Sequence, residues 1–346
     1  MPSTQKALLL EKKFGDFLIK ETEIYKPGPG EILIKIQATS LNPVDWKIQK
    51  YGIFVEEFPA VIGCDIAGDV EELGEGVIGF KKGDRVFVQG QFNYSRFSSF
   101  QQYCVAIAAT VAKLPDNWSY EQVSALPGVL TCAYVALYNK SPFGLGFEPP
   151  VSEATKGKYA GTPIVILGGA SSVGQIAIQL AKLSGFSPIL TTASLKHTEH
   201  LKSIGATEVF DRNLPSSALI TAIKKATGSQ PVKHVFDTVS SAKTEQDGLD
   251  ILASGGQIIL VLPLAVPAPE DKKVTTVSGF LRDPNNVELL ESLYRDHITA
   301  WLEQGVIKPN SIEILPRGLA GIPEGLARLQ KDQVSGFKLV AHPQET

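Results

Sequence analysis

The chain has 346 residues, 43% hydrophobic and 20% charged, which is typical of a folded protein long enough for two domains. A formal net charge of −3 and the lack of a basic block argue against nucleic acid as a partner. No apolar run is long enough for a membrane span or a signal peptide, and three scattered cysteines favour a reducing, cytoplasmic setting.

The first third of the chain predicts a compact, barrel-like β domain. Short strands with alternating apolar and polar residues are separated by Gly-rich turns, as in small barrels. These strands are expected at 5–13, 17–22, 31–37, 66–73, 85–89 and 100–106. Residues 41–52 (LNPVDWKIQKYG) are expected to form a loop, and the apolar segment 128–138 a helix.

A long loop at 139–161 leads into a second domain, in which strands and helices alternate. Such alternation predicts a parallel, doubly wound sheet of α/β class. The strands are expected at 164–167, 187–192, 208–210, 234–236 and 257–262. The helices are expected from about 172, then at 199–204, 216–227 and 246–253.

The first of these strands ends in a turn of small residues that opens a helix. The turn comprises Gly169, Ala170, Ser171, Ser172, Val173 and Gly174. Small side chains allow the backbone to approach a pyrophosphate, whose charge is stabilised by the N–H groups and the dipole at the start of the helix. Gln175 stands where a Walker loop needs lysine, so the turn predicts a dinucleotide site. A tight strand-to-helix turn without a ligand is the alternative.

The second strand is followed by Ser194, Lys196 and His197, with no acid to bind the hydroxyls of an NAD ribose. Hydroxyl and cationic donors suit a 2′-phosphate instead, so NADPH is the expected cofactor. The alternative interpretation is a solvated helix start, since serine is a common N-cap.

The last part of the chain is Pro-rich at 263–273 and then returns to strands and helices. Strands are expected at 274–280 and 312–315. A long helix is expected at 286–304 and a shorter one at 322–330.

These segments together resemble the medium-chain dehydrogenase/reductase superfamily, and within it the zinc-free fungal enoyl reductases that act in trans on polyketide synthases. The segments that resemble it lie at 41–47, 58–70, 81–87, 126–137, 165–182, 203–211 and 305–340. The resemblance implies a GroES-like barrel (1–126 and 275–346) around an inserted Rossmann domain (127–274), with the site in the cleft between them.

Zinc-dependent members carry a cysteine in the first catalytic loop, a Gly-His-Glu and a four-cysteine lobe. This chain has Asn42, Pro43 and Val44 in that loop, Gly63-Cys64-Asp65 at the second motif, and no cysteine cluster. Zinc sites need three or four N, S or O ligands, so no metal is expected. Hydride transfer to an activated C=C bond is then the expected chemistry.

The resemblance also implies roles for single residues. Asn42, Pro43 and Val44 line the nicotinamide and Lys47 points toward the substrate, with Tyr51 as the alternative proton donor. The other cofactor contacts that it implies are Thr131, Leu262 and Pro263 near the nicotinamide, and Arg212 and Lys338 near the phosphates.

Three functions remain open on the sequence. The first is an NADPH-dependent enoyl reductase working in trans with a polyketide synthase on a carrier-bound or small-molecule substrate. The second is a stand-alone quinone or enone reductase, and the third is an NADPH-binding protein without reductase activity. Monomer and homodimer are both left open, and no membrane partner is expected.

Overall fold

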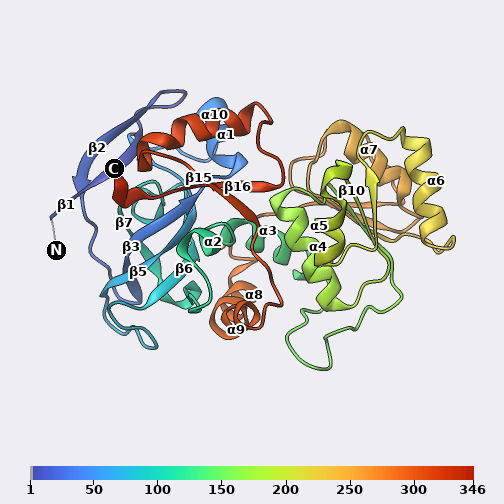
Figure 1. The fold of residues 1–346 in the computed structure, drawn as a ribbon, viewed down its shortest axis with the longest axis horizontal. Helices are drawn as coiled ribbons and strands as arrows, with labels where there is room; N and C mark the ends of the chain where they lie inside the picture. Colours follow the sequence, from blue (N-terminus) through green and yellow to red (C-terminus); the bar gives the residue numbers. More distant parts are fainter. Residues whose placement is uncertain (1–2) are drawn as a thin grey trace. The chain divides into compact units, whose positions relative to one another are not determined.

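The computed structural model describes residues 3–346, which form two units. Unit 1 contains the described residues up to Gly128 together with Phe280–Gly305 and Pro309–Thr346. Unit 2 contains Val129–Gly279 and Val306–Lys308. The blue and red ends of the chain therefore belong to the same unit (Figure 1). Within the described residues, no helix has the length and apolar character that a membrane span requires.

Unit 1 is built on two sheets. The larger has the order β15-β16-β3-β5-β6-β8, with β7 also paired to β3, and the smaller has the order β2-β1-β4. The bounds are β1 Thr4–Leu10, β2 Phe17–Glu23, β3 Glu31–Ser40, β4 Ala60–Val61, β5 Asp65–Leu73, β6 Arg85–Gln89, β7 Tyr103–Ile107, β8 Ala112–Lys113, β15 Ser311–Ile314 and β16 Phe337–Ala341. The antiparallel pairing of β16 with β3 joins the end of the chain to its beginning.

One expectation for unit 1 is wrong. Residues 41–52 are not a loop, because helix α1 (Pro43–Tyr51) occupies them. Proline at the first helical position, a capping box between Asn42 and Asp45, and Gly52 in the left-handed conformation at the end fix its limits. These start and stop signals are local and outweigh the weak apolar periodicity of the segment.

The expected helix at 286–304 is divided into α8 (Val287–Ser292), a π-helical turn at Leu293–His297, and α9 (Ile298–Glu303). The wide turn brings Leu293 and Ile298, five residues apart, onto one buried face. The expected strand at 274–280 is shorter, since β14 (Lys273–Thr276) ends before the chain enters unit 1 at Phe280.

Unit 2 contains a sheet of order β11-β10-β9-β12-β13-β14, in which every neighbouring pair is parallel. In chain order this is 3-2-1-4-5-6, the doubly wound order of Rossmann domains, so the expected fold class is confirmed. The strands are β9 Ile164–Leu167, β10 Ile189–Ala193, β11 Glu208–Asp211, β12 His234–Asp237, β13 Gln257–Leu260 and β14. The helices are α4 Ser172–Ser184, α5 Thr198–Ile204, α6 Ser216–Ala226 and α7 Ala242–Ile251. Helices α2 (Tyr120–Ser124) and α3 (Pro127–Tyr138) precede the sheet in the chain.

A buried ion pair anchors α1 inside unit 1. The Lys338 ammonium, 3% exposed, lies 2.7 Å from Oδ2 of Asp65, whose side chain is fully buried. Lys338 also donates to Oδ1 of Asn42 at 2.8 Å, and Asn42 Nδ2 donates to the same Asp65 oxygen. Ser40 and the Gly128 N–H complete the hydrogen bonds to this carboxylate. The N-cap of α1 is therefore tied to β5 and β16.

A second buried carboxyl, Asp45, adjoins this network. Its Oδ2 accepts a hydrogen bond from the Asn42 N–H at 2.7 Å, and its Oδ1 has no hydrogen-bond partner among residues 3–346. Burial raises the pKa of Asp45 to about 7, and the charge of Asp65 also raises it, although the Asn42 hydrogen bond and Lys338 act in the opposite direction.

We expect Lys338→Met to lower the free energy of unfolding by about 3–5 kcal/mol, because it leaves the buried Asp65 charge uncompensated. The matched control is Lys82→Met, which removes a surface ion pair between Lys82, 66% exposed, and Glu71. This control should cost less than about 1 kcal/mol. Urea denaturation measures both, and equal losses would contradict the role of the buried pair.

Asp45→Asn should change how stability depends on pH. The folded protein holds a proton at Asp45 up to about pH 7, whereas the unfolded chain releases it near the ordinary pKa of 3.8. The free energy of unfolding of the wild type therefore falls as the pH rises between these values. The variant lacks this titration, so its stability relative to the wild type should increase across that window. Parallel pH profiles in urea denaturation would be inconsistent with a proton on Asp45.

Candidate functional site

The turn between β9 and α4 in unit 2 admits only small residues. Gly168 has φ +82°, and a Cβ on Gly169 would lie 2.1 Å from Oγ1 of Thr191. A Cβ on Gly174 would lie 2.4 Å from the carbonyl oxygen of Gly168. The close approach of α4 to β9 thus depends on these glycines. Because they carry no side chains, the backbone N–H groups at the start of α4 remain accessible to a ligand.

Ser171, which stands where the usual fingerprint has its middle glycine, caps α4. Its Oγ accepts from the Gly174 N–H at 2.9 Å and lies 2.8 Å from Oγ1 of Thr238. Thr238 in turn donates to the Leu167 carbonyl, so the serine fastens the turn to the segment after β12. The turn lies at the carboxyl ends of β9 and β12, where the strand order reverses and where such sheets bind their ligands. The residues therefore fit a dinucleotide.

Cationic groups gather after β10 and β11 in the same unit. Partial burial lowers the pKa of His197, and the positive charges of Lys196, His200 and Arg212 lower it further, which places all four groups in one neighbourhood. The Arg212 N–H donates to the Ala193 carbonyl, so Arg212 lies at the end of β10. Ser194 precedes a 3-10 turn at Leu195–His197. His200, three residues after His197, was not singled out in the sequence, and its Nε2 lies 2.8 Å from Oε1 of Gln175 on α4.

The remaining predicted cofactor residues of unit 2 lie on α3 and in the segment that follows β13. Thr131 on α3 is fully buried, and its Oγ1 has no hydrogen-bond partner within the described part of the chain. Leu262 is half-buried and Pro263 is exposed, and both follow the carboxyl end of β13. Their contact with a nicotinamide stays a prediction.

Helix α1 of unit 1 carries the other predicted site residues. Asn42 is 8% exposed, and the network described above occupies its amide. Pro43 is exposed and Val44 is half-buried, so of these three residues only Pro43 and Val44 present appreciable surface to a ligand. Lys47 is half-buried, with its Nζ 5.6 Å from the centre of the Trp46 ring. Burial lowers the pKa of Lys47, and no carboxylate forms an ion pair with it among residues 3–346.

Tyr51 ends α1 and is 52% exposed. Its ring lies 5.8 Å from that of Trp46, and the Lys50 ammonium lies 5.6 Å from its centre. Lys47 is therefore the more enclosed of the two predicted donors.

Three aromatic rings form a cluster: Phe54, which lies in the loop after α1, and Phe92 and Phe280, which pack against it. The ring centres are 5.1 to 5.6 Å apart. Phe54 remains 52% exposed and has φ +67°, a conformation that aromatic residues rarely adopt. Sequence reasoning did not single out Phe54, since nothing in the sequence marks its strained backbone.

The resemblance implied that Lys338 on the last strand lies near a cofactor phosphate, but the structure shows its side chain to be only 3% exposed. Its ammonium is buried against Asp65 and Asn42 in unit 1, because β16 pairs with β3 and carries the side chain into the core. A contact between Lys338 and a cofactor phosphate stays a prediction.

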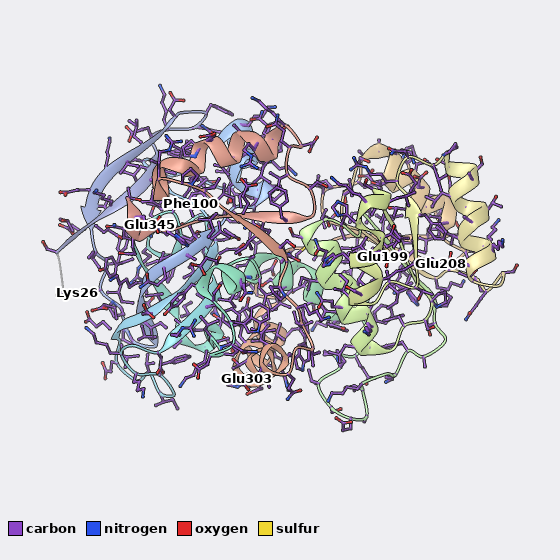
Figure 2. All side chains as sticks on the ribbon, viewed as in Figure 1. Lys26, Phe100, Glu199, Glu208, Glu303 and Glu345 are labelled. Carbon is purple, nitrogen blue, oxygen red and sulfur yellow. The ribbon has the colours of Figure 1, made fainter. Side chains whose placement is uncertain are left out.

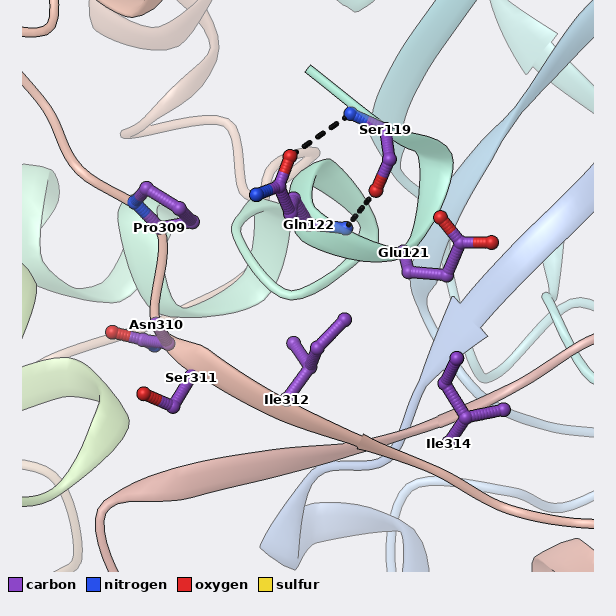
Figure 3. Close-up of a pocket in the computed structure, with 8 residues that line it drawn as sticks. All are labelled: Ser119, Glu121, Gln122, Pro309, Asn310, Ser311, Ile312 and Ile314. Atoms are coloured by element: carbon purple, nitrogen blue, oxygen red, sulfur yellow. Dashed lines mark hydrogen bonds between the residues drawn. The ribbon is translucent and has the colours of Figure 1, made fainter.

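A cavity of about 550 Å³ lies in unit 1 between α2 and β15 (Figure 3). Hydroxyl, amide and carboxylate groups line it together with Ile312 and Ile314. The Glu121 carboxylate at its edge pairs with His342 at 3.0 Å, and Ser119 caps α2 through Gln122. None of the residues that the sequence singled out lines this cavity, so it does not belong to the predicted site.

The residues that would replace zinc ligands do not fit the metal. The Asp65 carboxylate is committed to Lys338, Asn42, Ser40 and the Gly128 N–H. Burial holds the pKa of the Cys64 thiol well above its usual range, and the carboxylates of Asp65 and Asp45 raise it further, which disfavours the thiolate that zinc needs. The described residues 3–346 contain no group of three or more His, Cys, Asp or Glu side chains that could hold a metal.

Comparison with known proteins identifies the family. The description "Alcohol dehydrogenase GroES-like domain" matches residues 28–116, and "Zinc-binding dehydrogenase" matches residues 172–283. Dehydrogenase orsE of Emericella nidulans is 32% identical over 98% of this chain and 99% of its own. Trans-enoyl reductase himH of Aspergillus japonicus is 32% identical over 90% of this chain and 89% of its own.

The fold is shared with solved structures of oxidoreductases. A quinone oxidoreductase from Pseudomonas syringae pv. Tomato DC3000 superposes with a TM-score of 0.79 at 22% identity, covering 97% of this chain and 99% of its own. The first family description matches residues of the barrel unit, and the second matches mainly residues of the Rossmann unit. Dehydrogenase orsE is similar over both units. This chain belongs to the medium-chain dehydrogenase/reductase superfamily, whose dehydrogenases use nicotinamide cofactors.

Proposed function

We propose that this protein is an NADPH-dependent enoyl reductase that reduces the activated C=C bond of an enoyl thioester, in trans with a polyketide synthase. The observation that carries the proposal is Lys47 on α1, a half-buried lysine whose Nζ lies 5.6 Å from the Trp46 ring centre, with a lowered pKa and no ion pair among the described residues. The names of relatives similar over most of their length, such as trans-enoyl reductase himH, support the same reaction.

A bound reduced nicotinamide would supply hydride to the β-carbon of the substrate. The protein must then stabilise negative charge on the carbonyl oxygen and deliver a proton to the α-carbon. An ammonium whose pKa is lowered by burial is both a cation for the oxygen and a stronger acid than a solvated lysine. Lys47 meets both requirements without a metal ion, which the residues around Cys64 and Asp65 do not fit.

The acyl chain of the substrate also needs an apolar surface to bind against. The Phe54, Phe92 and Phe280 rings offer one on unit 1, and the exposed ring of Phe54 gives it an open face. We propose that these rings contact the acyl chain of the thioester.

The choice of NADPH rests on the cations near His197. Lys196 and Arg212 lie close enough to His197 to lower its pKa, and both follow the strands at whose ends NAD-binding members need an acid. These cations would neutralise a phosphate on the adenosine ribose, a group that NADH lacks.

We expect the double variant Lys196→Ala/Arg212→Ala to weaken NADPH binding by roughly tenfold or more, since each lost cation removes a charge-assisted contact to phosphate. NADH binding should stay within about twofold. Fluorescence titration of each cofactor measures both affinities. Lys224→Ala/Lys225→Ala on α6 removes the same charge elsewhere in unit 2 and should change neither. Equal weakening of NADPH binding by the two double variants would rule out a phosphate site.

Replacing Lys47 with alanine should lower the turnover of a 2-enoyl thioester by roughly tenfold or more while NADPH affinity holds. Lys26→Ala, at an exposed lysine of unit 1 (Figure 2), is the matched control and should leave turnover unchanged. Lys47→Arg keeps the charge but not the acidity, so it separates charge stabilisation from proton donation.

The substrate panel for this experiment also contains a quinone, and a primary alcohol with NADP⁺. Turnover of the quinone alone would move the protein to the stand-alone quinone reductases. NADPH binding without turnover of any substrate would favour a protein that has lost reductase activity. An unchanged rate in Lys47→Ala would remove this lysine from the mechanism.

A further inference from the structure

A surface of basic and aromatic side chains begins at the end of α1 and continues onto the turn between β1 and β2. It is composed of Lys12, Lys13, Phe14, Lys50 and Tyr51, and is called the basic aromatic patch. All five side chains are exposed, and the two rings keep 63% (Phe14) and 52% (Tyr51) of their surface in solvent. Exposed rings of this size next to charges are typical of interaction surfaces rather than of a solvated face.

The patch is held together by specific contacts. Gln49 Nε2 donates to the Gly15 carbonyl at 3.0 Å, which fastens α1 to the turn. A Cβ on Gly52 would lie 2.3 Å from Cε of Lys13 and 2.9 Å from Cε1 of Phe14. Glycine at the C-cap of α1 therefore lets these two side chains lie directly against the end of the helix.

The charge of the patch is not neutralised within the protein. Among the described residues, none of Lys12, Lys13 and Lys50 forms an ion pair, although the whole chain carries a net charge of −3. Asp16 shares the turn but pairs with none of them, and Glu11 is already bound to Lys20 at 2.8 Å. Unpaired cations at the end of α1 and on the turn that packs against it, in a protein with a net negative charge, complement an acidic surface on a partner.

The position of the patch relates it to the proposed substrate site. Lys47 and Lys50 lie on the same helix, and both ammonium groups lie within 6 Å of the Trp46 ring centre, at 5.6 and 5.7 Å. Helix α1 has nine residues and is therefore about 13 Å long. A partner bound to the patch would bring a thioester arm close to Lys47.

We propose that the basic aromatic patch is the docking surface for an acidic acyl-carrier domain, which presents its enoyl thioester to Lys47. This inference rests on the proposed function, because it assigns the partner that delivers the substrate. The lysines attract the acidic carrier and orient it, and the Phe14 and Tyr51 rings supply the apolar contact.

The test compares one acyl group in two forms: a 2-butenoyl thioester on an excised acyl-carrier domain, and the same acyl group on N-acetylcysteamine. The variant is Lys12→Glu/Lys13→Glu/Lys50→Glu, and Lys224→Glu/Lys225→Glu on α6 is the control for charge reversal. We expect the patch variant to lower kcat/KM for the carrier-bound substrate by roughly tenfold or more at low salt, and for the free thioester by less than about twofold. The control should change neither.

Carrier binding is also measured directly, by fluorescence anisotropy of the labelled carrier domain with the wild type and each variant. The proposal is supported if the patch variant, but not the control, loses affinity for the carrier. The loss should be smaller in Lys12→Gln/Lys13→Gln/Lys50→Gln, and salt should weaken the binding of the carrier to the wild type. Unchanged affinity, or equal losses with free and carrier-bound substrate, would overturn it. If the wild type reduces neither thioester, the proposed function fails, and the binding result still decides whether the patch holds an acidic carrier.

Discussion

The ion pair between Asp65 and Lys338 is the constraint on which the rest of unit 1 depends. Both groups are buried, so each needs the other and the polar atoms around them. Because Asn42 bonds to both partners, the same network fixes the N-cap of α1 and hence the direction in which Lys47 leaves the core. The lysine of the last strand is thus paired with Asp65, the residue that follows Cys64.

Each unit contributes a different part of the proposed chemistry. Unit 2 offers the start of α4 and a group of cations, which suit a phosphorylated dinucleotide. Unit 1 offers an enclosed lysine, an aromatic wall and a basic surface, which suit a tethered enoyl thioester and its carrier. In unit 2, Ser171 caps α4. In unit 1, Gly52 leaves room for the Lys13 and Phe14 side chains at the end of α1.

The parts of the fold that local patterns determine could be predicted from the sequence. The alternation of strands and helices in unit 2 and the small-residue turn at Gly169–Gly174 are of this kind. Helix α1 was not predicted, although Asn42, Pro43, Asp45 and Gly52 mark its ends, because the apolar periodicity of the segment is weak. The partner of Lys338 could not be predicted, since Asp65 is 273 residues away and the contact requires β16 to pair with β3. The strained backbone of Phe54 likewise follows from packing with Phe92 and Phe280.

The most direct test of the central claim is to follow the transferred hydrogen. A 2-enoyl thioester is incubated with the protein and NADPH carrying deuterium at the transferred position of the nicotinamide, and the product is analysed by NMR. Reduction of the activated double bond predicts one deuterium at the β-carbon of a saturated thioester and a solvent-derived proton at the α-carbon. Deuterium found instead at the carbonyl carbon, or an unreacted thioester beside a reduced quinone, would contradict reduction of the activated double bond.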